Sequence, residues 1–182
     1  MKAVDLDSGP SAHIPLAVAT WALFVGLALM LAGAGLFATL VGVRADTEGF
    51  PSAVLGVISA AYYAGFLVGS RIALRTLGTV GHIRVYAAFA SVLAATIVVV
   101  GMIPHPAAWV LLRFITGVCI AGQFVVAESW LIGLATNTNR GRLLAVYGLV
   151  TGASFGLGQA GVAPLDPTEL TGFALAAVAI SL

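Results

Sequence analysis

Long apolar runs, separated by short polar or proline-containing segments, dominate the pattern of the chain. A membrane-spanning helix needs roughly 20 mostly apolar residues. By that measure we predict five full spans and the start of a sixth, at about residues 14–43, 53–70, 85–103, 107–134, 143–165 and 171–182. The runs do not alternate apolar and polar positions as the strands of an outer-membrane barrel do. The pattern therefore predicts an all-α membrane protein in which residues 1–182 form a single bundle.

The sixth apolar run begins with residues that are typical of a helix start, but it ends without a helix-stop signal. Asp166, Pro167 and Glu169 are typical of a helix start, as an N-cap, a first-turn proline and a capping-box acid. At about 1.5 Å per residue, residues 171–182 cover ~18 Å, which is short of a ~30 Å hydrocarbon core. We therefore expect the chain to be an N-terminal fragment of a longer protein.

Composition narrows the class of protein further. Of 182 residues, 60% are hydrophobic and 8% are charged, and the mean hydropathy is +1.09. A soluble domain carries roughly 45–50% apolar and about 25% charged residues, so a soluble fold and a disordered chain are both excluded. The single cysteine, Cys119, can form neither an internal disulfide nor a cysteine-based metal cluster. A net charge of +1 gives no reason to expect a nucleic-acid partner.

Lysine and arginine are unevenly divided between the two sides of the predicted membrane. Six fall on one side, in the N-terminal tail, the second-to-third connection and the fourth-to-fifth connection, against Arg44 alone on the other. Cytoplasmic loops carry the excess of basic residues. We therefore predict that the N-terminus is cytoplasmic, with Arg84 and Arg142 on the cytoplasmic side and Asp46 and Asp166 on the other.

Two charges lie within the predicted fourth span. Arg113 sits roughly 10 Å below the outer end of its helix, where a charge either faces a bundle interior or cavity, or snorkels to the outer headgroups. Glu128 lies near the cytoplasmic end, on broadly the same side of the helix. Glu128 is either paired with an arginine at that level or solvated at the membrane edge.

Several other residues could act inside the membrane or simply pack. Tyr62 and Tyr63 in the second span and Gln123 in the fourth can hydrogen-bond a ligand or a neighbouring helix. The fifth span carries Gly148, Gly152 and Gly156, spaced by four residues. This spacing places the glycines on one helix face, which we expect to pack closely or to slide. Trp109 lies near a helix end, where anchoring at the membrane interface explains a tryptophan.

Catalytic and cofactor signatures are absent from the sequence. It has no Ser-His-Asp set, no paired carboxylates, no Cys/His spacing for a metal and no Walker-type phosphate loop. We therefore expect no enzyme activity, no cofactor and no metal.

Specific motifs lie in and around the fourth span. Arg113 and Gly117 fit an R-x-x-x-G pattern. Residues 126–131 read V-A-E-S-W-L, residues 139–143 read N-R-G-R-L, and residues 81–84 read G-H-I-R. Through these segments the chain, from about residue 23 to residue 182, resembles the N-terminal half of a major facilitator superfamily (MFS) transporter of the YcaD-like branch.

The resemblance implies a fold and a mechanism. The chain would form one MFS-type six-helix bundle of a twelve-helix secondary transporter in the bacterial inner membrane, with the C-terminal half absent. A small solute would bind near mid-membrane between two bundles and move by alternating access, coupled to protons or another ion. The implied partners are the lipid bilayer, that solute, the coupling ion and the missing C-terminal bundle. The candidate residues for the substrate cavity or for coupling are Arg113, Gly117, Gln123 and Tyr62.

The chain departs from the superfamily pattern in two places. The second-to-third connection contains basic residues but lacks the acid of the G-x-x-x-D-R-x-G-R motif, and the fifth span lacks the Gly-Pro pair of the antiporter motif. We predict that Glu128 supplies the missing acid. It would form a cytoplasmic gate with one of four arginines, which are Arg71, Arg75, Arg84 and Arg142.

Two other interpretations remain open on the sequence. One is a non-transporting membrane scaffold or integral subunit, which needs neither Arg113 nor Glu128 in its membrane segments. The other is a half-size protein that works as a homodimer.

Overall fold

The computed structural model describes residues 16–136 and 139–182, and these residues form six helices and no strand. The prediction of an all-helical fold is confirmed. The helices are α1 (Leu16–Thr47), α2 (Ser52–Val80), α3 (His82–Met102), α4 (Pro106–Leu134), α5 (Arg140–Ala160) and α6 (Leu170–Ser181). Lys2 and the predicted start of the first span at residue 14 lie outside the described residues. Five of the helices, α1 to α5, are long and apolar enough to cross a membrane, whereas α6 has 12 residues.

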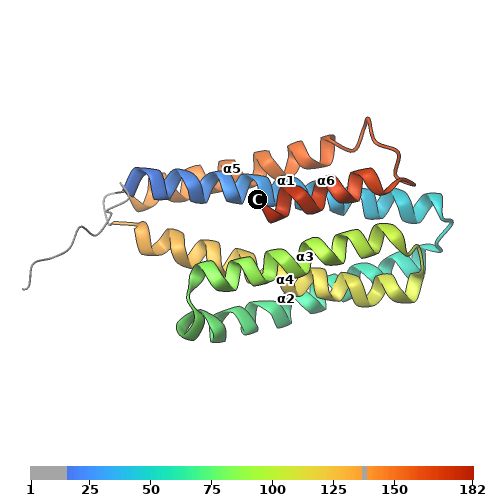
Figure 1. Ribbon diagram of the computed structural model, residues 1–182, viewed down its shortest axis with the longest axis horizontal. Helices are drawn as coiled ribbons and strands as arrows, with labels where there is room; N and C mark the ends of the chain where they lie inside the picture. The colour runs from blue at the N-terminus through green and yellow to red at the C-terminus, as the bar shows by residue number, and fades with distance from the viewer. Residues whose placement is uncertain (1–15, 137–138) are drawn as a thin grey trace, which may run out of the picture.

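Successive helices run in opposite directions and form two groups, as Figure 1 shows: α1, α5 and α6 on one side, and α2, α3 and α4 on the other. Helix α6 joins the groups by packing against both α1 and α3. Helix α2 packs chiefly on α4, and α5 packs chiefly on α1. The six helices therefore form an open arc with α2 and α5 at its two ends.

The main hydrophobic core lies between α1, α3, α4 and α6. Helix α6 contributes Phe173, Ala176, Ala177 and Ile180, whose spacing of three and four residues makes one buried stripe. Phe37 of α1 meets Phe173 edge to face, with ring centroids 6.3 Å apart. A second, smaller cluster packs α1 against the C-terminal half of α4. Its members are Phe24, Leu27, Met30, Leu31, Ala127 and Leu131.

Glycines allow α2 and α4 to pack backbone to backbone. A Cβ atom at Gly65 would overlap the Phe114 carbonyl oxygen, and one at Gly69 would overlap that of Val118. A Cβ atom at Gly117 would overlap the Tyr62 carbonyl oxygen. Without a Cβ at these points the two helices approach closely enough for dispersion to hold them together.

Two helices end at other residues than the predicted spans do. Helix α2 continues ten residues past the predicted end at residue 70, so Arg71 and Arg75 lie on the helix and not in a loop. Nothing between them breaks a helix, and Ala73 is fully buried. The whole α2–α3 connection is Gly81, whose φ of 90° favours glycine. Helix α5 ends at Ala160 and not at residue 165, because Pro164 and Pro167 prevent its continuation.

The bundle has two chemically different ends. The α1–α2 and α5–α6 connections lie at one end, where Arg44 donates to the Pro167 carbonyl oxygen over 3.0 Å. The α2–α3 and α4–α5 connections lie at the other end, where His82 and Ser129 are hydrogen-bonded. Asp46 and Asp166 therefore lie at the first end and Arg84 and Arg142 at the second, as the sequence predicts. Which end faces the cytoplasm stays a prediction.

Candidate functional site

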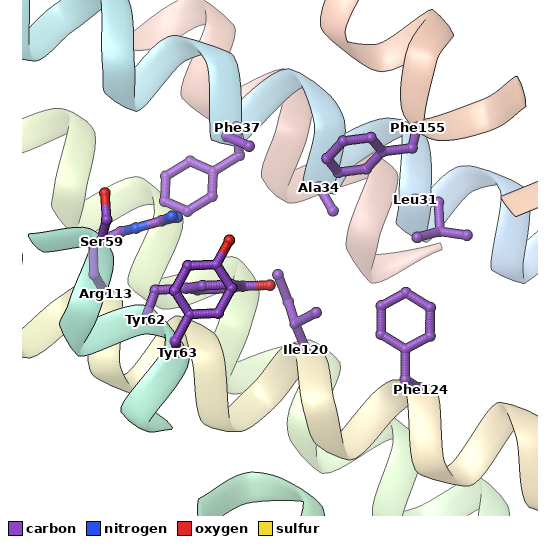
Figure 2. A pocket seen from close by; sticks show the side chains of 11 residues that line it. Leu31, Ala34, Phe37, Ser59, Tyr62, Tyr63, Arg113, Ile120, Phe124 and Phe155 are labelled. Atoms are coloured by element: carbon purple, nitrogen blue, oxygen red, sulfur yellow. The ribbon is translucent and has the colours of Figure 1, made fainter. Parts of the chain in front are cut away.

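A cavity of about 310 Å³ opens between α1, α2, α4 and α5. Its walls are mostly apolar and aromatic, and its polar groups are one guanidinium and three hydroxyls (Figure 2). The lining residues are Leu31, Ala34, Phe37, Ala38, Ser59, Tyr62, Tyr63, Arg113, Ile120, Phe124 and Phe155. The two tyrosines, the serine and Arg113 come from α2 and α4, and the opposite wall from α1 and α5 is apolar.

Arg113 supplies the positive charge of the cavity. Its guanidinium carbon lies 4.6 Å from the centroid of the Tyr62 ring and 5.5 Å from that of Phe37. Figure 2 shows the side chain reaching into the space between these two rings. The sequence left open whether Arg113 faces a cavity or extends to the outer headgroups, and in the structure it faces the cavity. Cation–π contacts of this kind stabilise a desolvated guanidinium but provide no counter-charge.

The position of Arg113 follows from the glycine one helical turn later. Gly117 packs against the backbone of Tyr62, so α4 touches α2 at the level of the Tyr62 ring. Arg113, four residues earlier on the same helix, then lies over that ring. The R-x-x-x-G pattern thus has a local physical reason. The glycine allows the two helices to approach closely, and the arginine one turn earlier then reaches the Tyr62 ring of the neighbouring helix.

Arg113 has unused hydrogen-bonding capacity. Its Nε is buried and has no hydrogen-bond partner. Within residues 16–136 and 139–182 the only ion pair joins Arg44 and Glu48, so no described carboxylate neutralises Arg113. A guanidinium carries five N–H donors in a fixed fork. The cavity therefore holds a positive charge whose donors are free for a further partner.

Gln123 lies elsewhere. Its side chain is fully buried, neither polar atom of its amide has a partner, and it is not among the residues that line the cavity. Tyr62 and Arg113 are brought together at the cavity, and Gly117 contacts its wall, whereas Gln123 is separate from it.

Glu128 does not form the predicted ion pair in this conformation. Its Oε1 accepts a hydrogen bond from the Tyr147 hydroxyl over 3.0 Å, and no described arginine lies within ion-pairing distance. The four predicted partners are all exposed, and Arg71 donates to the carbonyl oxygen of Leu67 on its own helix. The reason is position, because α2 carries Arg71 and Arg75 along its own exposed side while Tyr147 of α5 faces Glu128.

The glycine stripe of α5 does not pack within the described part of the chain. Gly148, Gly152 and Gly156 are exposed, and a Cβ atom on any of them would meet nothing within 4 Å. The close contact between α1 and α5 uses other glycines. A Cβ at Gly158 would overlap the Ala32 carbonyl oxygen, and one at Gly35 would overlap that of Phe155. This stripe therefore makes no close contact within the described residues, and close packing or sliding at it stays a prediction.

Sequence reasoning missed part of the cavity. Ser59 and Tyr63 are four residues apart on α2, so a polar pair on one helix face was a usable signal for Ser59. Phe37 and Phe155 carry no such signal, because an aromatic residue in an apolar span is indistinguishable from core. Trp109 is also not an interfacial anchor: it is fully buried, and its indole N–H donates to the Ile103 carbonyl oxygen over 2.8 Å.

Comparisons with known proteins define the class. A family model described as "Uncharacterised MFS-type transporter YbfB" matches residues 33–165. The chain is 34% identical to an uncharacterized MFS-type transporter of Enterobacter sp. (strain 638), over 86% of this chain and 42% of the relative. It is also 34% identical to the MFS-type transporter YcaD of Escherichia fergusonii, over 81% of this chain and 38% of the relative. No solved structure matches the chain.

A helical bundle with five apolar helices of membrane-spanning length defines a multi-pass membrane protein. The chain belongs to the major facilitator superfamily of transporters. It spans about two fifths of the length of the curated relatives it matches. The resemblance predicted from its motifs is confirmed.

Proposed function

We propose that the chain is the N-terminal bundle of a secondary transporter that moves a small solute across the bacterial inner membrane. A C-terminal six-helix bundle would close over the cavity, and the two would alternate between states open to either side. Coupling to protons or another ion would drive net movement. The N-terminus and the arginine-rich end would face the cytoplasm, because basic residues accumulate there.

The observation that carries this proposal is the cavity at the open side of the arc. A scaffold gains nothing from a charge held between aromatic rings within an apolar helix, because such a charge is costly to desolvate. Arg113 is such a charge, and the space beside it is large enough for a small ligand. The exposed faces of α2 and α5 flank this space at the two ends of the arc, where a second bundle would pack.

Two-sided access to the cavity tests the proposal without knowledge of the solute. Ser59 lines the cavity and differs from cysteine by one atom, so Ser59→Cys in a Cys119→Ala background of the full-length protein reports on access. We expect an impermeant maleimide to label the Ser59→Cys protein in both right-side-out and inside-out vesicles, because alternating access exposes the cavity to each side in turn.

Two matched variants serve as one-sided controls. Arg140→Cys lies at the start of α5 and should label only from the cytoplasmic side, and Asp166→Cys only from the other. Labelling of Ser59→Cys from one side alone, with both controls behaving as stated, would contradict alternating access and favour the scaffold. Labelling of position 140 from outside would instead overturn the orientation.

A further inference from the structure

We infer that the solute bound in this cavity is an organic anion, which carries one carboxylate- or phosphate-like group on an apolar or aromatic body. The inference rests on the proposed transport function, since it names the substrate class of that same cavity. It is carried by the juxtaposition of a guanidinium that has no carboxylate partner with walls of aromatic and aliphatic side chains.

The charge of the cavity selects the sign of the ligand. Of the 11 residues that line it, Arg113 is the only one with a charged side chain. A cationic ligand would have to lie beside this guanidinium with no carboxylate among the lining residues. The two aromatic rings nearest to this charge, those of Tyr62 and Phe37, are already in contact with Arg113, so these ring faces are not free for a cationic ligand.

The free donors of Arg113 match a particular kind of anion. The guanidinium fork pairs with carboxylate and phosphate groups through two parallel N–H···O bonds, which a spherical ion cannot form. The aromatic contacts with Tyr62 and Phe37 hold the fork in place, so less side-chain freedom is lost when the anion binds. Ser59 and Tyr63 expose further hydroxyls on the same wall.

The rest of the wall selects the body of the ligand. Leu31, Ile120, Phe124 and Phe155 line the end of the cavity away from Arg113, as Figure 2 shows, and offer no hydrogen bond. A sugar or another polyhydroxylated solute would leave most of its hydroxyl groups unpaired against this surface, at a cost for each. An aromatic or alkyl group would instead bury apolar area there.

A matched series of probes separates the alternatives. Phenylacetate, phenylacetamide and phenethylamine present the same ring with an anionic, neutral or cationic head, and acetate presents the anion without the ring. The full-length Cys119→Ala, Ser59→Cys protein in lipid nanodiscs is alkylated with a maleimide at increasing concentrations of each probe. We expect phenylacetate to slow alkylation at concentrations at least tenfold lower than the other three.

Arginine variants assign the effect to Arg113. Arg113→Gln in the same background should raise the protective concentration of phenylacetate at least tenfold, and Arg113→Lys, which keeps the charge but loses the fork, should give a smaller loss. Arg140→Gln, at the start of α5 and outside the cavity, is the matched control and should change nothing. Retained α-helical circular dichroism and a monodisperse elution profile establish that each variant is folded.

Three results would overturn the inference: equal or better protection by the amide or the amine, no protection by phenylacetate, or protection that Arg113→Gln leaves unchanged. Protection by acetate equal to that by phenylacetate would overturn the apolar body of the ligand. These results are separable from failure of the proposed function. If Ser59→Cys is labelled from one side only but phenylacetate protects it, alternating access is refuted and the anion site stands. If Ser59→Cys is labelled from both sides but phenylacetate does not protect it, the anion site is refuted and alternating access stands.

Discussion

Two arginines in this bundle are withdrawn from solvent in different ways. Arg44, at the end of α1, is 8% exposed and has its Nε 2.7 Å from the Glu48 Oε1, with a second bond to the Pro167 carbonyl oxygen. Arg113 has aromatic rings in place of a carboxylate. The first arrangement satisfies the charge and ties two connections together. The second leaves it available, which is what a binding residue requires.

Glu48→Gln should destabilise the folded protein, because it leaves the buried Arg44 without its counter-charge. Breaking a fully buried pair costs about 3–5 kcal/mol, and we expect about 1–2 kcal/mol here because the Glu48 side chain is 30% exposed. The measurement is the free energy of unfolding in mixed detergent micelles. Asp46→Asn is the control, since Asp46 is exposed and has no ion pair among the described residues. Equal losses of unfolding free energy in Glu48→Gln and Asp46→Asn would contradict a specific role of the Arg44–Glu48 ion pair.

Asp166 gives a prediction of pH dependence. Its Oδ1 accepts hydrogen bonds from the Thr168 hydroxyl, at 2.6 Å, and from the Thr168 backbone N–H, at 2.7 Å. These bonds, with a smaller contribution from Arg44, hold the pKa of the Asp166 carboxyl below its ordinary value. The carboxylate therefore stabilises the α5–α6 connection above its ordinary pKa, and this contribution is lost as the pH falls through the lowered pKa.

Thr168→Ala should move the pKa of Asp166 up towards its ordinary value, because it removes the hydroxyl donor and keeps the backbone one. The measurement is the titration of the Asp166 carboxyl carbon by NMR. Thr171→Ala is the control, since the Thr171 hydroxyl donates to Glu169. A pKa that is the same in the parent and in Thr168→Ala would show that the hydroxyl bond does not cause the shift.

At the scale of the helices, the sequence predicted the elements well and their contacts poorly. Apolar runs are long enough to define each span, so all six helices were found. Four-residue spacing also located a small-residue face on α5, but it could not say whether that face has a neighbour. Gly65 meets the α4 backbone while Gly148 meets nothing within 4 Å. The difference depends on the partner helix, which no local pattern encodes.

The same limit explains the errors at the cavity. The sequence indicates Arg113 because a charged residue stands out in an apolar run. It does not indicate Phe37, because an aromatic residue in such a run cannot be told from a core residue. The predicted pairing of Glu128 is not made in this conformation for a related reason: several arginines lie near its level in the sequence, and only the rotation of α5 decides that Tyr147 is the group in contact.

Gly65→Ala should weaken the packing of α2 on α4. The new methyl group would overlap the Phe114 carbonyl oxygen, and backbone cannot move aside as a side chain can. Overpacking of this kind costs about 1–3 kcal/mol. Gly78→Ala on the same helix is the control: it meets nothing within 4 Å and should be neutral or stabilising by up to ~1 kcal/mol, since alanine is the better helix former. Unfolding free energies that do not differ between the two would refute the close contact.

At the scale of the molecule, different contacts hold the helices together at the two ends of the bundle, the end with Asp166 and the arginine-rich end. At the end with Asp166, α6 and the Arg44 contacts join neighbouring elements. At the arginine-rich end, the hydrogen bond from Tyr147 to Glu128 joins α5 to α4, which belong to opposite groups of helices. The second hydrophobic cluster lies beside it, with Tyr147 packed against its edge. In the proposed transport cycle, this bond between α5 and α4 would have to break if the two groups of helices separated at that end.

Tyr147→Phe should favour opening at the arginine-rich end, because it removes the hydroxyl that binds Glu128 and keeps the aromatic ring. A hydrogen bond to a charged group contributes up to about 1.5–3 kcal/mol when buried, and Glu128 is exposed, so we expect a smaller shift of about threefold to tenfold. The measurement is the ratio of maleimide labelling of Ser59→Cys from the two sides, in the Cys119→Ala background of the full-length protein. Tyr86→Phe on α3 is the control, since its hydroxyl has no hydrogen bond among the described residues. A labelling ratio that Tyr147→Phe leaves unchanged, or that Tyr86→Phe shifts equally, would remove the Tyr147–Glu128 bond from the gate.

Glu128→Gln should shift the ratio in the same direction as Tyr147→Phe, because a neutral amide is a weaker acceptor than a carboxylate.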